Sequence, residues 1–164
     1  MPPEIVTNLQ LALNGMATGA IYALVALGLV ITYKATEVLN FAHGDVLMAS
    51  AFVAWGLIVG LGLPFWLAAL ITVAFAAALA WQIDARIMRR IVGQPQFAGV
   101  MLTIAVAFML RGLVSMFFGP ESRSYPTPWT QQSTHIGPMV VSDLNLVILA
   151  VALVLTVLIY AFLR

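Results

Sequence analysis

The chain has 164 residues, of which 63% are hydrophobic and 8% charged, and its formal net charge at pH 7 is +1. This small number of charged groups cannot form the polar shell of a water-soluble domain of this length. Lipid must therefore be the solvent for most of the chain. The small net charge without a basic stripe excludes a nucleic-acid-binding surface, and the absence of cysteine excludes disulfides, thiol nucleophiles and thiolate metal sites.

Long apolar segments recur along the whole sequence. A helix needs about 20 mostly apolar residues to cross a bilayer core of about 30 Å. Five segments meet that length, at about 9–33, 41–63, 65–83, 97–118 and 144–163. We predict an all-α fold in which residues 1–164 form a single transmembrane domain, a polytopic bundle of about five spanning helices. The Pro-rich stretch at about 119–143 is predicted to be an outer loop.

The basic residues between the spans predict the orientation of the chain. Lys and Arg collect in short cytoplasmic loops. Four loop residues and the last residue fall on one side of a five-span chain, and only Arg123 falls in a loop on the other; the first group is Lys34, Arg86, Arg89, Arg90 and Arg164. We therefore expect the amino terminus outside and the carboxyl terminus in the cytoplasm. Arg86 and Arg90 are also expected to meet anionic head groups or a cytoplasmic partner.

The first span carries a stripe of small residues. Gly15, Gly19 and Ala23 lie on nearly the same face of a helix. Small residues at this spacing let a second helix approach closely. Helix packing is the plainer interpretation, and lining of a solute path is the alternative.

Polar residues are unusually dense where the second span begins, in Asn40-Phe41-Ala42-His43-Gly44-Asp45. Residues two apart on a helix point about 200° apart, so His43 and Asp45 cannot both face one neighbour. Either the helix is broken at Gly44, or the two side chains serve different surfaces. Asn40 or Asp45 could cap the following helix, or the segment could be a broken-helix element beside a transport path.

The ionisable residues do not form a recognisable catalytic or metal centre. A metal site at His43 and Asp45 would need further ligands, and the other histidine, His135, lies in the predicted outer loop. The spans contain no nucleophile with an adjacent base and no carboxylate pair at one depth. We predict no catalytic residue, no metal ligand and no enzymatic activity.

Arg111 lies well inside the fourth span, with Thr103 two turns before it on roughly the same face. An arginine is too costly to leave in lipid without compensation. It could snorkel or bond to carbonyl groups of a neighbouring helix. Alternatively, Arg111 could line a polar cavity that the solute uses.

The sequence resembles the LivH-type branched-chain amino acid permeases over almost its whole length. The hexapeptide at 40–45 is the most specific motif, supported by segments 14–15, 20–24, 83–86, 94–97, 101–104 and 118–120. The resemblance implies a permease subunit of an ATP-binding-cassette importer in the bacterial inner membrane, which carries branched-chain or related amino acids. It also places Asn40, Phe41, His43, Gly44, Asp45 and Thr103 near the translocation path or its gate. Arg111 is added to this group because of its position inside the fourth span.

The same resemblance implies the partners. These are a second related permease, two cytoplasmic ATPases and a periplasmic solute-binding protein, with ATP and magnesium held by the ATPases and no cofactor in this chain. Members of the family are nearly twice as long, and residue 164 is about where the family begins the cytoplasmic loop that engages the ATPase, followed by three more spans. The resemblance therefore implies that this sequence is truncated relative to the family and lacks that loop. Two other functions stay open from the residues alone: a passive channel for an amide or urea, and a membrane subunit that assembles without transporting.

Overall fold

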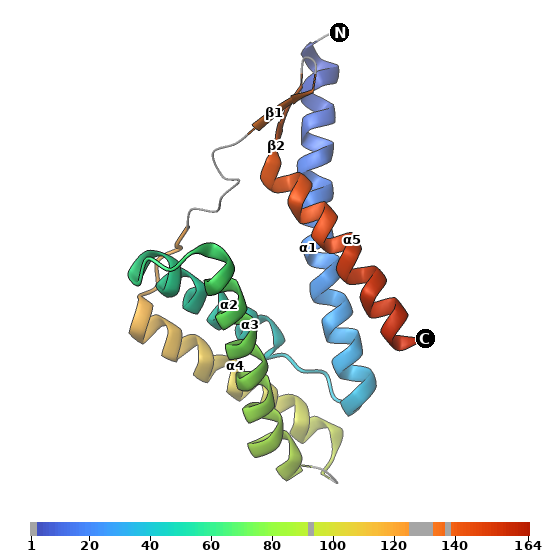
Figure 1. The fold of residues 1–164 in the computed structure, drawn as a ribbon. Coiled ribbons are helices and arrows are strands. Elements are labelled where there is room, and N and C mark those ends of the chain that lie inside the picture. Colours follow the sequence, from blue (N-terminus) through green and yellow to red (C-terminus); the bar gives the residue numbers. More distant parts are fainter. Residues whose placement is uncertain (1–2, 92–93, 125–132, 137–138) are drawn as a thin grey trace. The chain divides into compact units, whose positions relative to one another are not determined.

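The computed structural model describes residues 3–91, 94–124, 133–136 and 139–164 (Figure 1). It is built from five long helices: α1 (Pro3–Thr36), α2 (His43–Trp55), α3 (Phe65–Arg86), α4 (Gln96–Phe118) and α5 (Asp143–Leu163). A π-helical turn at Gly56–Gly60 continues α2, and a 3-10 turn at Met88–Ile91 follows α3. Five helical stretches in the described ranges are long and apolar enough to cross a membrane, which confirms the predicted fold class.

The helix ends differ from the apolar windows by a few residues. α1 begins earlier and ends later than the window at 9–33, because a helix ends where its backbone bonding ends, whatever the hydropathy. Glu37 adopts a left-handed φ of 57° just after α1, and its backbone N–H donates to the carbonyl of Tyr33 at 2.8 Å. Such a residue closes the last turn of a helix and sends the chain in a new direction.

A short hairpin lies within the predicted outer loop. Strand β1 (Ser133–Ile136) pairs antiparallel with β2 (Met139–Ser142), so that Ser133 lies opposite Ser142 and Ile136 opposite Met139. The sequence did not predict these strands, because alternation over four residues is too short a signal. Residues 125–132 and 137–138 of the loop lie outside the described residues.

The chain divides into two compact units. The α2–α4 unit comprises residues 29–125, and the α1–α5 unit comprises residues 1–28 and 126–164. In the α2–α4 unit, α2 packs against both α3 and α4. Its core is a cluster of five buried apolar residues, Ala42, Ile83, Val106, Ala107 and Leu110. In the α1–α5 unit, the amide Nδ2 of Asn145 on α5 donates to Oδ1 of Asn14 on α1.

Large apolar side chains cover the outside of the helices. Phe162 is 90% exposed, Met116 81% and Trp66 71%, and many Leu, Val and Phe residues are similarly uncovered. In water, surfaces of this extent would aggregate, whereas lipid tails solvate them. The exposed surface therefore agrees with the composition in making this a multi-pass membrane protein.

Candidate functional site

The connection between α1 and α2 is a tight turn held by Asn40. Its Oδ1 accepts a hydrogen bond from the backbone N–H of Ala42 at 3.0 Å, and its backbone carbonyl accepts from the N–H of His43 at 3.2 Å. Ala42, only 1% exposed, anchors the turn in the core of the α2–α4 unit. Asn40, two residues before the N-cap residue Ala42, thus fixes the turn that leads into α2.

The structure resolves the alternatives at the start of α2. The helix begins at His43 and runs through Gly44 without a break, and its N-cap residue, Ala42, makes no side-chain cap bond. The interpretation of Asp45 as a cap is wrong, because its carboxylate bonds to Arg111 on α4. His43 instead lines a pocket that α3 borders. The two side chains therefore serve different surfaces, as their spacing allows.

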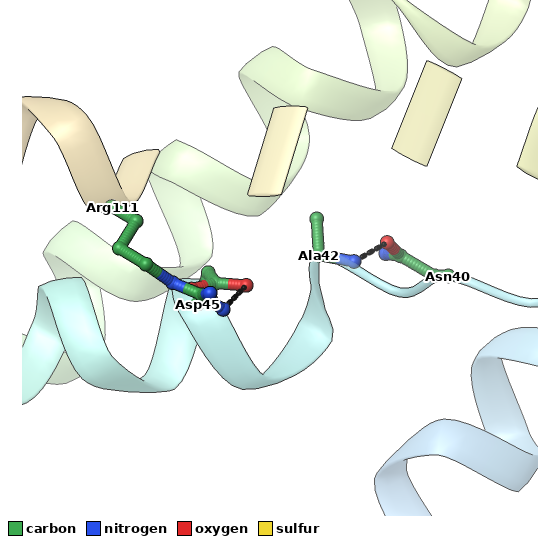
Figure 2. A network of polar contacts seen from close by, with 4 residues as sticks. All are labelled: Asn40, Ala42, Asp45 and Arg111. Atoms are coloured by element: carbon green, nitrogen blue, oxygen red, sulfur yellow. Dashed lines mark hydrogen bonds and ion pairs between the residues drawn. The ribbon is translucent and has the colours of Figure 1, made fainter. Parts of the chain in front are cut away.

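Asp45 and Arg111 form a two-pronged ion pair between α2 and α4 (Figure 2). The Nε of Arg111 lies 3.0 Å from Oδ1 of Asp45, and its Nη2 lies 3.2 Å from Oδ2. The side chain of Asp45 is 8% exposed and that of Arg111 59%, with the guanidinium 5.8 Å from the centre of the Phe108 ring. A bidentate pair of this kind neutralises both charges and fixes the relative position of the two helices.

This ion pair was not among the interpretations of Arg111 that the sequence suggested. The signal was nevertheless present, because Asp45 and Arg111 are opposite charges in two otherwise apolar spans, and each is costly without a partner. A hydropathy analysis scores each span by itself, so it does not show that the two residues are partners. Only the pairing of α2 with α4 shows that each compensates the other.

Thr103 ties the same turn to α4 at a second point. The residue is 0% exposed, and its hydroxyl lies 2.8 Å from the carbonyl oxygen of Val100 and 3.3 Å from that of Leu39. A hydroxyl has one proton, which is shared here between a carbonyl of its own helix and one from the turn. Thr103 and Arg111 thus fix the segment around Asn40 to α4 on both sides of Ala42.

A pocket of about 320 Å³ opens beside this turn, entirely within the α2–α4 unit. Its polar lining residues are Thr32, Thr36, Asn40, His43, Asp84 and Thr103. Its apolar lining residues are Val38, Val46, Leu47, Ala76, Ala80, Ile83 and Met88. The volume lies at the lower end of the range for small-molecule sites, which starts at about 300 Å³.

The pocket gathers some of the predicted path residues and leaves others out. Asn40, His43 and Thr103 line it, together with Thr32, Thr36 and Asp84, which the sequence did not single out. Phe41, Gly44, Asp45 and Arg111 are not among its lining residues. Thr32, Thr36 and Asp84 come from the last turns of α1 and α3, so only the way these ends meet α2 reveals them.

The basic residues Lys34, Arg86 and Arg89 lie at the same end of the α2–α4 unit as the pocket. Thr36 near the end of α1 and Asp84 near the end of α3 line the same pocket, so both helices end where α2 begins. Lys34, Arg86 and Arg89 belong to the same ends and are exposed, with Arg89 Nε 3.4 Å from Asp84 Oδ2. The side chain of Arg90 lies outside the described residues. The pocket is therefore at the end that the distribution of basic residues predicts to be cytoplasmic.

The small residues of the first span have no close neighbour. Gly15, Gly19 and Ala23 are exposed, and a Cβ added at either glycine would meet nothing within 4 Å. Their predicted role in helix packing stays a prediction. Across the described ranges, no group of three or more His, Cys, Asp or Glu residues could hold a metal ion.

These features define a class of protein: a multi-pass helical membrane protein with a polar-walled pocket at one end of a three-helix unit. A model of the family described as "Branched-chain amino acid transport system / permease component" matches residues 11–163, and the chain belongs to that family. This family membership confirms the resemblance carried by the hexapeptide at 40–45.

Two kinds of named relative support this assignment. The high-affinity branched-chain amino acid transport system permease protein BraD of Pseudomonas aeruginosa is 30% identical over 134 residues, which is 76% of this chain and 43% of the relative. The corresponding LivH proteins of Salmonella typhimurium and Escherichia coli are 27% identical over 142 residues, 80% of this chain and 46% of the relative. The chain thus spans about half the length of these relatives. No solved structure matches it.

Proposed function

We propose that this chain is a permease subunit of an ATP-binding-cassette importer that moves branched-chain or related amino acids across the bacterial inner membrane. The observation that carries the proposal is the match to the permease family over residues 11–163. The partners proposed with it are a second related permease, two cytoplasmic ATPases that hold ATP and magnesium, and a periplasmic solute-binding protein. No covalent chemistry takes place on this chain.

The structure adds physical support for a transport role. Transport needs polar groups that a solute can reach within an otherwise apolar bundle, and such groups usually face protein or water. Asn40 and His43, both partly exposed, supply them in a pocket beside the start of α2. Asp45 and Arg111 act indirectly, since their ion pair holds α2 against α4 without lining the pocket.

Reconstitution tests the proposal. The permease would be produced with its candidate partners, purified as a complex and placed in liposomes, and uptake of labelled leucine would be measured with and without ATP in the presence of the solute-binding protein. We expect leucine to accumulate only when ATP and the binding protein are both supplied. An ATP analogue that cannot be hydrolysed serves as the control.

The other outcomes separate the competing functions. Downhill uptake of leucine, amides or urea that does not depend on ATP would favour a passive facilitator and refute the proposal. A complex that assembles completely but moves no solute under any of these conditions would favour a subunit with a purely assembling role.

A further inference from the structure

We infer that the pocket beside α2 is a binding site for a zwitterionic amino acid with a small aliphatic side chain, whose carboxylate is held by Asn40 and His43 and whose ammonium group is held by Asp84. The inference rests on the proposed function and deepens it, because it assigns the transported class of solute to named residues. It also places the site inside a single permease unit, at the end predicted to be cytoplasmic.

The carboxylate of the solute is assigned to Asn40 and His43. Oδ1 of Asn40 is used by the backbone N–H of Ala42, which leaves the Nδ2 hydrogens to donate. In the part of the chain that the structure describes, the imidazole of His43 makes no hydrogen bond, and both side chains line the pocket. An amide N–H and an imidazole N–H that line the same pocket are donors suited to a carboxylate.

The ammonium group is assigned to Asp84. It is the one carboxylate among the residues that line the pocket, because Asp45 is bonded to Arg111 and lies outside it. The present partner of Asp84 is Arg89, at 3.4 Å, and the Arg89 side chain is 69% exposed. An exposed pair of this kind contributes little, so Asp84 can exchange Arg89 for a solute ammonium at small cost.

The apolar lining residues limit the size of the side chain. Val46 and Leu47 on α2 and Ala76 and Ala80 on α3 line the pocket. The two alanines provide the open space, and larger residues there would fill it. A wall of methyl groups gives a branched aliphatic chain favourable contact and offers no partner to a polar side chain.

The test compares two neighbouring alanines of α3 in the assembled transporter. Ala76 lines the pocket, whereas Ala77 is exposed and does not. Equilibrium binding of labelled leucine to the purified complex and ATP-driven uptake would be measured for Ala76→Leu and Ala77→Leu. We expect Ala76→Leu to weaken leucine binding roughly tenfold or more, and to weaken alanine binding less, because the added methyl groups occupy the side-chain space. Ala77→Leu should match the unmodified protein.

A second variant keeps the test informative if Ala76→Leu assembles poorly. Asp84→Asn should weaken leucine binding about tenfold or more, since a charge-assisted hydrogen bond is lost. Competition by isopentylamine, which lacks the carboxylate, should disappear in this variant, while competition by 4-methylpentanoate, which lacks the ammonium, should not change. Arg89→Gln is the matched control, because it leaves Asp84 in place and should bind leucine as before.

The outcomes separate this inference from the proposed function. Normal leucine binding and uptake in both Ala76→Leu and Asp84→Asn would overturn the inference and leave the proposed function intact. Leucine binding that depends on Ala76 and Asp84, in a complex that moves leucine without ATP, would uphold the site and overturn the importer. A complex that does not bind leucine would refute the inference directly.

Discussion

The two units of the chain use polar residues in different ways. In the α2–α4 unit, an ion pair, a shared threonine hydroxyl and an asparagine turn join separate elements around a buried core. In the described residues of the α1–α5 unit, a hydrogen bond between two asparagines joins the long helices. A third of the apolar window of α4 is buried within the chain, but only 6% of that of α5. The first unit is therefore held by its own contacts, and the second presents almost all of its surface to its surroundings.

The largest effect is expected from breaking the ion pair that defines the α2–α4 unit. Arg111→Met leaves the carboxylate of Asp45 buried without a partner, which should reduce stability by about 3 kcal/mol. Denaturant titration of the purified protein in detergent, followed by circular dichroism, measures this change. Arg86→Met, at an exposed helix end, is the control and should change stability little. The exchange Asp45→Arg with Arg111→Asp should recover part of the loss, and an equal loss in both arginine variants would contradict the structure.

The next effect comes from the apolar core of the same unit. Leu110 is 5% exposed and Leu113, one turn later on α4, is 44% exposed. Leu110→Ala should cost about 2 kcal/mol through the cavity it leaves, and Leu113→Ala under about 0.5 kcal/mol. The same denaturant titration compares them. Equal losses would mean that the buried core of this unit does not cover this face of α4.

Two threonines compare the units directly. Thr103 shares its hydroxyl between α4 and the turn at Leu39, whereas Thr156 bonds only within α5, to the carbonyl of Ala152 at 2.8 Å. Thr103→Val should lower the unfolding free energy by about 1 kcal/mol, because the carbonyl of Leu39 loses a donor. Thr156→Val should be close to neutral, since that carbonyl keeps its helical bond. A larger loss of unfolding free energy in Thr156→Val than in Thr103→Val would contradict this comparison of the two units.

The smallest effect is expected in the α1–α5 unit. Asn145→Leu removes the hydrogen bond to Asn14, and such bonds between membrane helices contribute about 0.6 kcal/mol on average. Thermal unfolding of the variant in detergent should therefore show only a small shift. A loss as large as that of Arg111→Met would contradict this, because it would exceed what a hydrogen bond of this kind contributes.

The sequence predicted the helices well because bilayer thickness fixes their length. The five spans follow from hydropathy, and Lys34, Arg86 and Arg89 do lie at the same end of their unit. The ion pair between Asp45 and Arg111 could not be predicted from the sequence, since it depends on which helices become neighbours. The same reason hid Thr32, Thr36 and Asp84, whose shared pocket exists only because two helix ends meet the start of a third.

The hexapeptide at 40–45 shows, within one segment, what the sequence could predict and what it could not. Its density of polar groups predicted a special site, and the spacing of His43 and Asp45 correctly allowed two surfaces. The spacing did not predict which role each of the two side chains has. One side chain fixes α2 to α4 and the other lines a pocket with α3, because the neighbours on either side of α2 differ.

The absence of cysteine from the chain permits a direct test of the pocket and of its side of the membrane. Ala80→Cys places one thiol among the residues that line the pocket, and Ala77→Cys places one on the same helix outside the pocket as a control. The rate of modification by a membrane-impermeant thiol reagent would be measured in inside-out and right-side-out vesicles of the assembled transporter, with and without leucine. We predict that Ala80→Cys reacts from the cytoplasmic side and that leucine slows the reaction. Modification from the external side alone, or a rate that leucine does not change, would contradict the account.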